Sequence, residues 1–127
     1  MKTTPNQEPT TENQILKQLE QFTGTEHYYN NGMNKKILYT DGVKFLAEKC
    51  GAYWLIDEII NHLIFKNLII NEFITVDLIK TGKSAKLIFD DGNGNVLYKK
   101  NISFTDFPLE KIRLFYSNNV ILLPSEN

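Results

Sequence analysis

The sequence predicts an α+β domain whose N-terminal helices pack on one face of an antiparallel sheet of about five strands. Two patterns support this fold class. Apolar residues follow the helical period up to residue 71, and they then alternate with polar residues, as in strands with one buried face. The chain has 127 residues, of which 42% are hydrophobic, and this is enough for one domain with a core. We assign residues 11–127 to this single domain.

The N-terminal part of the sequence predicts a tail, a helix and a loop. Residues 1–10 are polar and contain two prolines, which indicates a disordered tail. A helix begins at Thr11, a suitable N-cap, and ends before Gly24. Its apolar face consists of Ile15, Leu16, Leu19 and Phe22. Residues 23–34 form a polar and aromatic loop that is longer than a simple connection requires.

The middle of the chain predicts a short strand followed by two helices. Residues 35–39 form the strand, and Thr40 or Asp41 caps a helix that Gly51 terminates. A second helix over residues 52–65 is apolar around much of its circumference. Such a helix is expected to be central and covered on more than one side.

The remaining residues predict antiparallel strands. Three strands are expected at residues 73–80, 85–89 and 96–104. A last hairpin joins Ile112–Tyr116 to Val120–Leu123, with a helix as the alternative for its first arm.

The segment DDGNGN, residues 90–95, resembles the front of a calcium-binding loop. Such a loop also requires a glycine and a bidentate acid further on, where this chain has Val96 and Ile102. Asp and Asn beside Gly are also typical of tight turns. We therefore interpret DDGNGN as a structural turn.

The charge balance argues against two broad classes of function. Lys and Arg total 14 against 15 Asp and Glu, so the net charge is -1. This balance argues against a general nucleic-acid coat and against a protein of anionic membrane surfaces. No segment approaches the roughly 18 apolar residues of a membrane span, and no signal-peptide pattern is present. We therefore expect a cytoplasmic protein without membrane contact.

Side chains suited to catalysis or metal binding are scarce. The chain has two histidines, one cysteine (Cys50) and one arginine (Arg113). Glu58 and His62 lie one helical turn apart, but a zinc site needs at least a third ligand, so we interpret them as part of a solvated helix face. No phosphate-binding glycine motif and no nucleophile–base pattern is recognisable. We expect no catalytic residue, no metal, no cofactor and no enzymatic activity.

Tyrosine and lysine residues are the best candidates for contacts with a partner. Tyrosine is a common anchor of protein interfaces, and two tyrosines lie in the polar loop. Lysines that share one sheet face would also permit local RNA contact. The predicted partner-binding residues are Tyr28, Tyr29, Lys35 and Lys36, with Lys99 and Lys100 as the second choice.

A pocket for a small ligand or nucleotide is the alternative site. The helix start TDG would offer backbone amides to an anion, although its aspartate would oppose one. The residues expected to converge there are Tyr39, Asp41, Tyr53, Trp54 and Asp57. For Tyr53 and Trp54 the simpler interpretation is that they close the edge of the core.

Five segments resemble a domain-of-unknown-function family of small proteins from bacteria, phages and other mobile elements. The resemblance covers about residues 15–126. The segments are FTGTEHYY (Phe22–Tyr29), YTDGVKFLAEKCGAYWLIDEI (Tyr39–Ile59), FDDGNGN (Phe89–Asn95), TDFPL (Thr105–Leu109) and VILLPSE (Val120–Glu126). The resemblance implies no particular activity and no functional residues.

The setting that the resemblance implies favours a binder that acts on a host machine. We hypothesise a non-enzymatic protein-binding module whose partner is a host protein or ribonucleoprotein. The specific form is an inhibitor of a host defence system, similar to anti-CRISPR proteins and acting on an RNA-guided nuclease. The alternative is a domain that sequesters a small ligand or nucleotide.

Overall fold

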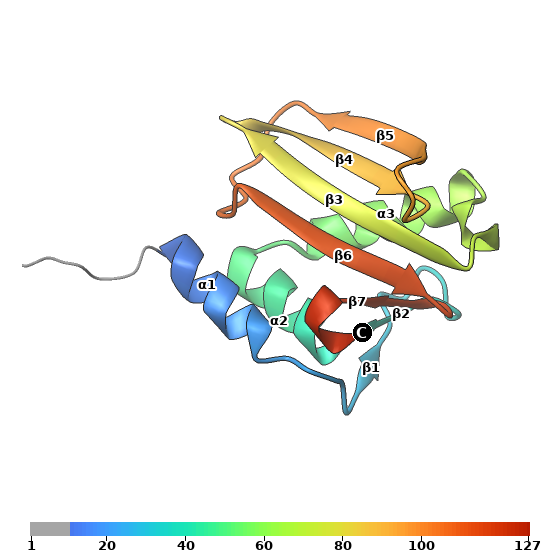
Figure 1. Cartoon of the computed structure of the whole chain (residues 1–127), viewed down its shortest axis with the longest axis horizontal. Coiled ribbons are helices and arrows are strands. Elements are labelled where there is room, and N and C mark those ends of the chain that lie inside the picture. Colours follow the sequence, from blue (N-terminus) through green and yellow to red (C-terminus); the bar gives the residue numbers. More distant parts are fainter. Residues whose placement is uncertain (1–10) are drawn as a thin grey trace, which may run out of the picture.

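A computed structural model describes residues 11–127 of the chain, and the predicted tail over residues 1–10 lies outside this described part. One mixed sheet of seven strands runs through the molecule in the order β1-β2-β7-β6-β3-β4-β5 (Figure 1). Its strands are β1 (Tyr28–Tyr29), β2 (Leu38–Thr40), β3 (Phe73–Thr81), β4 (Ser84–Asp90), β5 (Val96–Ile102), β6 (Lys111–Ser117) and β7 (Val120–Leu122). Neighbouring strands are antiparallel except β2 and β7, which are parallel.

The α+β class is confirmed, but the sheet has more strands than predicted and is not purely antiparallel. The strand β1 lies in the segment that was predicted to be a loop, because a strand of two residues has no alternation to read. The parallel pair joins Leu38 to Val120, and nothing local in either segment specifies that register. The segment 112–116 is a strand, so its helical alternative is wrong.

The predicted helices are confirmed at close to their expected ends. They are α1 (Thr11–Glu20), α2 (Asp41–Cys50) and α3 (Tyr53–Phe65), and two single 3-10 turns, η1 (Leu68–Ile70) and η2 (Pro124–Glu126), follow later in the chain. Thr40 caps α2, because its hydroxyl accepts a hydrogen bond from the backbone N–H of Val43 at 3.3 Å. Gly51 ends α2 in the left-handed conformation with a φ of 61°, as its position predicts.

The helices lie in two places relative to the sheet. The helix α3 lies behind the central strands, whereas α1 and α2 lie beside β6 (Figure 1). Buried residues of all three helices belong to one core with the sheet. The strand β7 pairs only with residues 115–117 of β6, so the first half of β6 has no strand on that side. The residues Leu16 and Leu19 of α1 line a groove with that half of β6. The predicted packing of the N-terminal helices on one face of the sheet is therefore only roughly matched.

The DDGNGN segment is a turn, as predicted, and its two aspartates accept hydrogen bonds from its own backbone. Asp90 Oδ1 accepts from the N–H groups of Gly92 and Gly94 at 2.7 and 3.1 Å. Asp91 Oδ1 accepts from the N–H groups of Asn93 and Asn95 at 2.8 and 3.3 Å. The hydrogen bond from the Asn95 side chain, followed by that from the Asn93 backbone, lowers the pKa of Asp91. Both carboxylates are thus engaged within the turn.

Candidate functional site

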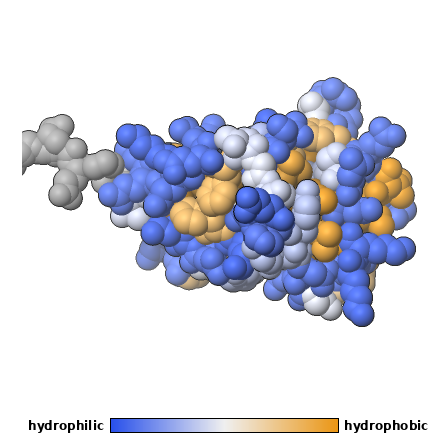
Figure 2. Space-filling view, turned by 90° about the horizontal axis from the view of Figure 1, so that it is seen from below, coloured by the Kyte–Doolittle hydropathy of each residue, from blue (hydrophilic) through white to orange (hydrophobic). Residues whose placement is uncertain are grey.

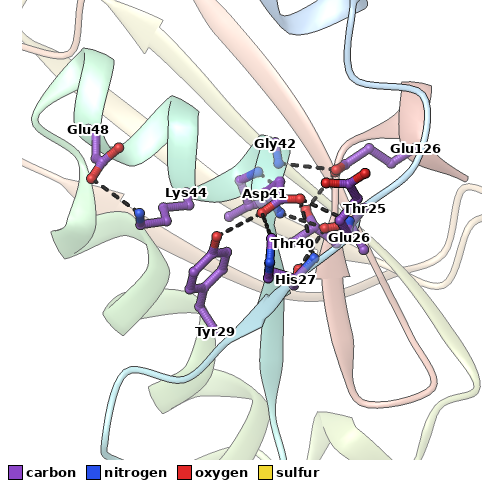
Figure 3. Close-up of polar contacts among 11 residues, drawn as sticks. Thr25, Glu26, His27, Tyr29, Thr40, Asp41, Gly42, Lys44, Glu48 and Glu126 are labelled. Carbon is purple, nitrogen blue, oxygen red and sulfur yellow. Dashed lines mark hydrogen bonds and ion pairs between the residues drawn. The ribbon is translucent and has the colours of Figure 1, made fainter.

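Three segments that are distant in the sequence meet at the N-terminus of α2 (Figure 3). They are the segment before β1, the start of α2 with its cap, and the C-terminal turn η2. Two carboxylates, Asp41 and Glu126, connect them through hydrogen bonds. We call these residues and their partners the α2 network: Thr25, Glu26, His27, Tyr29, Thr40, Asp41, Gly42, Leu123 and Glu126.

Asp41 holds the segment before β1 against α2. Its Oδ2 accepts hydrogen bonds from the backbone N–H groups of Glu26 at 2.9 Å and His27 at 3.3 Å. Its Oδ1 accepts from the Tyr29 hydroxyl at 2.8 Å. The Asp41 N–H in turn donates to the Thr25 hydroxyl at 2.8 Å. The Asp41 side chain is therefore occupied by its own chain.

These contacts change the acidity of the two side chains in the pair. The hydrogen bond from the Glu26 backbone, with that from the Tyr29 hydroxyl second, lowers the pKa of Asp41 to about 2. The hydrogen bond between Tyr29 and Asp41 also raises the pKa of Tyr29, because the phenol donates to a carboxylate that is already charged. At neutral pH the site thus holds an anionic Asp41 and a neutral Tyr29.

Glu126 performs the corresponding role for the C-terminus. It accepts hydrogen bonds from the Thr40 hydroxyl at 2.6 Å and from the backbone N–H groups of Gly42 at 3.1 Å and Leu123 at 2.9 Å. A Cβ atom at Gly42 would lie 2.5 Å from Leu123 Cδ1 and 2.8 Å from Glu126 Oε1. A side chain at position 42 would therefore displace the side chains of Leu123 and Glu126 from their present packing on α2.

The surface around β1 presents side chains that the α2 network does not use. Tyr28 is 56% exposed, and Met33 in the following loop is 48% exposed. Lys35 and Lys36 are also exposed. Seen from below, the molecule is mostly hydrophilic with separate apolar patches (Figure 2). We call these four side chains, together with Tyr29, the β1 surface.

The two predicted tyrosines point in different directions. Tyr29 is partly buried, contacts the Tyr39 ring with centroids 5.6 Å apart, and has the Lys44 ammonium 4.9 Å from its ring centroid. Tyr28 pairs with Thr40 in the ladder and lies mostly in solvent. Tyr28 is therefore the more accessible of the two predicted contacts.

The loop between β1 and β2 is held by asparagine side chains. The Asn30 side chain donates to the Asn34 carbonyl at 2.6 Å and accepts from the Gly32 N–H at 2.8 Å. The Asn31 side chain donates to the Asp57 carboxylate on α3 at 2.9 Å. These contacts hold the loop that leads to Lys35 and Lys36.

Lys99 and Lys100 do not join the other predicted contacts. They lie on β5, at the opposite edge of the seven-stranded sheet from β1. Lys100 pairs with the buried Leu87 and its ammonium lies 2.8 Å from both Glu58 carboxylate oxygens. Lys99 points to the opposite face of the sheet. The six predicted contacts thus divide into two separate surfaces.

The residues of the alternative pocket are also divided. Tyr39 is buried beneath Tyr29, and burial raises its pKa. Tyr53 is 42% exposed, and Asp57 bonds to the β1–β2 loop. Trp54 points elsewhere, with its ring 6.4 Å from that of Phe107. It lines two hollows, and neither of them includes Tyr39, Asp41, Tyr53 or Asp57.

The half-buried Cys50 and the pair formed by Glu58 and His62 are the other side chains relevant to catalysis or metal binding. Burial raises the pKa of the half-buried Cys50 thiol to about 11. His62 Nε2 lies 3.1 Å from Glu58 Oε2, as their spacing predicts. The interpretation of this pair as a solvated helix face is wrong, because His62 is largely buried against the Phe89 and Tyr98 rings. Across residues 11–127, no three His, Cys, Asp or Glu side chains gather as a metal ion would require. In the same part of the chain, every helix is too short or too polar to cross a membrane.

A groove of about 570 Å³ lies between α1, the sheet and η2. Its walls are mainly apolar, with Lys111 and Arg113 at the sheet side. The Arg113 guanidinium already binds the Asp77 carboxylate through two hydrogen bonds of 2.7 and 2.9 Å. Sequence reasoning missed this groove, because its residues come from α1, β3, β6 and the C-terminal turn, which are distant in the sequence.

Sequence reasoning also missed Glu126, Thr25 and Gly42 as members of one network. A signal was present, because they lie in three of the segments that carry the family resemblance, FTGTEHYY, YTDG and VILLPSE. The structure brings these three segments together around Asp41 and Glu126 (Figure 3). Their shared role is to join the two ends of the chain to α2.

Comparison with known proteins gives one result. No curated protein and no solved structure matches this chain. A family model described as a family of unknown function, DUF6876, matches residues 13–127. This match spans almost all of the described residues and includes the three segments of the α2 network. The chain therefore belongs to the DUF6876 family of unknown function.

Proposed function

We propose that this protein is a non-enzymatic protein-binding module that contacts its partner through the β1 surface. The observation that supports this proposal is that the Tyr28 side chain is exposed while the backbone beside it is held in place. Its side chain is 56% exposed, while the neighbouring backbone is held by hydrogen bonds from Glu26 and His27 to Asp41. A contact that is already ordered loses less entropy when a partner binds.

The chemistry of this surface suits a protein or ribonucleoprotein partner. Tyr28 and Met33 provide exposed apolar area, and aromatic residues often dominate the binding energy of interfaces. Lys35 and Lys36 add positive charge beside them, which favours an acidic protein surface or a local phosphate contact.

A more specific proposal concerns the biological role. We infer an inhibitor of a host defence system that acts inside the cell on an RNA-guided nuclease, as anti-CRISPR proteins do. The support is the setting implied by the family resemblance of small bacterial, phage and mobile-element proteins, together with the β1 surface as a means of contact. The inhibitor would act by occlusion, which requires binding and no chemistry.

The test compares the wild-type protein with the triple variant Tyr28→Ala, Lys35→Ala, Lys36→Ala. Each protein is immobilised, exposed to bacterial lysate, and the bound protein and nucleic acid are identified. The affinity for the recovered partner is then measured by calorimetry. We expect the triple variant to bind about tenfold or more weakly, because it lacks an exposed aromatic anchor and two cations.

The matched control is Lys83→Ala, Lys86→Ala, which removes two exposed lysines in and beside the β3–β4 turn. It should retain the partner. If the wild type and the triple variant bound the same partner with equal affinity, the β1 surface would be excluded as the binding site. For the specific role, wild type should block target cleavage by a purified RNA-guided nuclease and the triple variant should not. If a panel of such nucleases cleaved their targets fully in the presence of the wild-type protein, the proposed inhibition of RNA-guided nucleases would be excluded.

The groove beside α1 favours one alternative function, the binding of a small apolar ligand with an anionic group. Leu16, Ile79 and Ile112 provide apolar walls, and Lys111 provides a cation. A thermal-shift screen with nucleotides and apolar carboxylates tests this alternative. A ligand present at 100 times its Kd should stabilise the protein by about 2.7 kcal/mol. A screen without any shift would exclude these ligands.

A further inference from the structure

The edge of the sheet opposite β1 is a seven-residue strand with a neighbour on one side only. The strand β5 pairs with β4 from Ala85 opposite Ile102 to Asp90 opposite Val96, and it is the last strand of the sheet (Figure 1). An edge strand has N–H and C=O groups that can pair with an extended chain. The other edge, β1, has only two residues.

Two adjoining hollows lie beside this edge, on the side of α3. Ile102 and Lys100 pair with the buried Ala85 and Leu87, so they face the helix side of the sheet. Trp54 and Ile102 line both hollows, which have volumes of about 250 and 230 Å³. The Trp54 ring stands edge-on to Phe107 at an angle of 87°, and this contact fixes it from the inside.

The larger hollow combines aromatic surface with an unpaired negative charge. Phe104, which is 68% exposed, and Asp106 line it together with Trp54. Within residues 11–127, Asp106 forms no hydrogen bond or ion pair. Aromatic rings and a carboxylate together attract a cation. The hollow is therefore suited to a basic side chain.

The charges of the smaller hollow are already compensated. The Lys100 ammonium lies 2.8 Å from both carboxylate oxygens of Glu58, and His62 contacts the same carboxylate at 3.1 Å. Burial by itself raises the pKa of Glu58, but the hydrogen bond and charge of Lys100, followed by those of His62, outweigh it, and the net effect lowers this pKa. This leaves Asp106 as the uncompensated charge beside Trp54.

We propose that β5 binds an extended peptide segment of a partner protein as an eighth strand, with an Arg or Lys side chain of that segment in the Trp54–Asp106 hollow. Main-chain hydrogen bonds to β5 would supply affinity, and the hollow would supply specificity. This surface lies at the other edge of the sheet from the β1 surface and does not depend on Tyr28.

The two faces of β5 specify a sequence pattern for the peptide. Side chains of an added strand alternate between the α3 side, where the hollow lies, and the outer face of the sheet. Lys99 is exposed on that outer face, opposite Ile88 in the ladder. A basic residue on the α3 side should therefore alternate with an acidic residue that can pair with Lys99.

A second copy of this chain fits the edge poorly. Antiparallel self-pairing of β5 about its centre would place Lys99 directly opposite Lys99 of the other copy. Like charges opposite each other destabilise a strand pair. The charge pattern thus favours a different chain with basic and acidic residues at alternate positions.

The test selects ligands from a displayed library of random nine-residue peptides on the wild-type protein. Trp54 is the chain's one tryptophan, so its fluorescence reports binding at this hollow without a label. We expect enriched peptides with an alternating basic and acidic pattern, a change in Trp54 fluorescence, and backbone amide NMR shifts concentrated in residues 96–102.

Two variants separate the hollow from a general charge effect. Asp106→Asn should weaken binding of the best peptide about tenfold. For a version of that peptide in which Gln replaces the basic residue, the same substitution should weaken binding less than about twofold. The control Glu72→Gln changes another exposed carboxylate that has no partner among the described residues, and it should leave binding unchanged.

Several outcomes would overturn the proposal. They are the absence of enriched peptides, enrichment without a basic residue, and equal binding by Asp106→Asn. Sedimentation that shows a dimer displaced by the peptides would assign β5 to a second copy instead. The β1 triple variant should bind the peptides normally, so failure of this proposal and failure of the β1 surface give different results.

Discussion

The two edges of the sheet use their polar side chains in opposite ways. At the β1 edge, Asp41 and Glu126 are occupied by hydrogen bonds from their own chain, and these bonds hold three distant segments together. At the β5 edge, Asp106 has no partner among the described residues, and Phe104 lies in solvent. A polar cluster that the fold already uses has little capacity left for a ligand. The unused groups at β5 and the exposed Tyr28 are therefore better candidates for binding.

The strongest test of this difference is Gly42→Ala in the α2 network. The new Cβ would lie 2.5 Å from Leu123 Cδ1 and 2.8 Å from Glu126 Oε1, so these two side chains must shift. We expect a loss of about 1–3 kcal/mol in the free energy of unfolding, as for other overpacked sites. Urea unfolding followed by circular dichroism measures it.

Gly24→Ala is the matched control for that substitution. A Cβ atom at Gly24 meets no other atom within 4 Å. Its unfolding midpoint should stay close to that of the wild type. If Gly42→Ala were equally neutral, the Leu123 and Glu126 side chains would make room without loss of stability, and the contrast between the two edges would weaken.

A smaller effect is expected from Asp41→Asn, and it should depend on pH. The pKa of Asp41 is about 2 in the folded protein, below its ordinary value of 3.8, so folding favours the charged form. Its stabilising contribution is complete above about pH 4 and is lost as the pH falls towards 2. The difference in stability between wild type and variant should therefore shrink over this interval.

Thermal unfolding between pH 2 and pH 6 measures this difference. Asp106→Asn, at the other edge, is the matched substitution and should leave stability unchanged, because its side chain has no partner among residues 11–127. A constant difference between wild type and Asp41→Asn across the whole pH range would contradict the role of the carboxylate charge.

The smallest effect on stability is expected for Phe104→Ser at the β5 edge. Because this side chain is 68% exposed, its removal should change the free energy of unfolding by no more than about 0.5 kcal/mol. Urea unfolding measures this change. A loss above about 1 kcal/mol would mean that Phe104 holds the segment after β5 in place, so that the fold already uses it.

Sequence reasoning identified most regular elements because their signals are local. The apolar face of α1, the cap at Thr40 and the glycine at position 51 each depend on neighbours within one or two turns. The turn at residues 90–95 is similar, since its aspartates bond to their own backbone. Such features need no knowledge of the rest of the fold.

The candidate sites were harder to predict because they combine distant segments. Tyr29 and Asp41 were assigned to different sites, yet they form one hydrogen bond of 2.8 Å. Lys99 and Lys100 were grouped together, although alternation along β5 places them on opposite faces. Trp54 was placed with Tyr39, whereas its ring packs against Phe107.

The sequence by itself determined the three helices, the strands after residue 71, the turn at residues 90–95 and the shortage of side chains suited to catalysis. Only the tertiary structure decided the parallel pairing of β2 with β7, the two edges of the sheet and the hydrogen bonds that join Glu126 to Thr40 and Gly42. The physical reason is the range of the interactions. Helix caps and turns depend on residues close in sequence, whereas strand order and the α2 network depend on contacts between segments that are distant in the sequence.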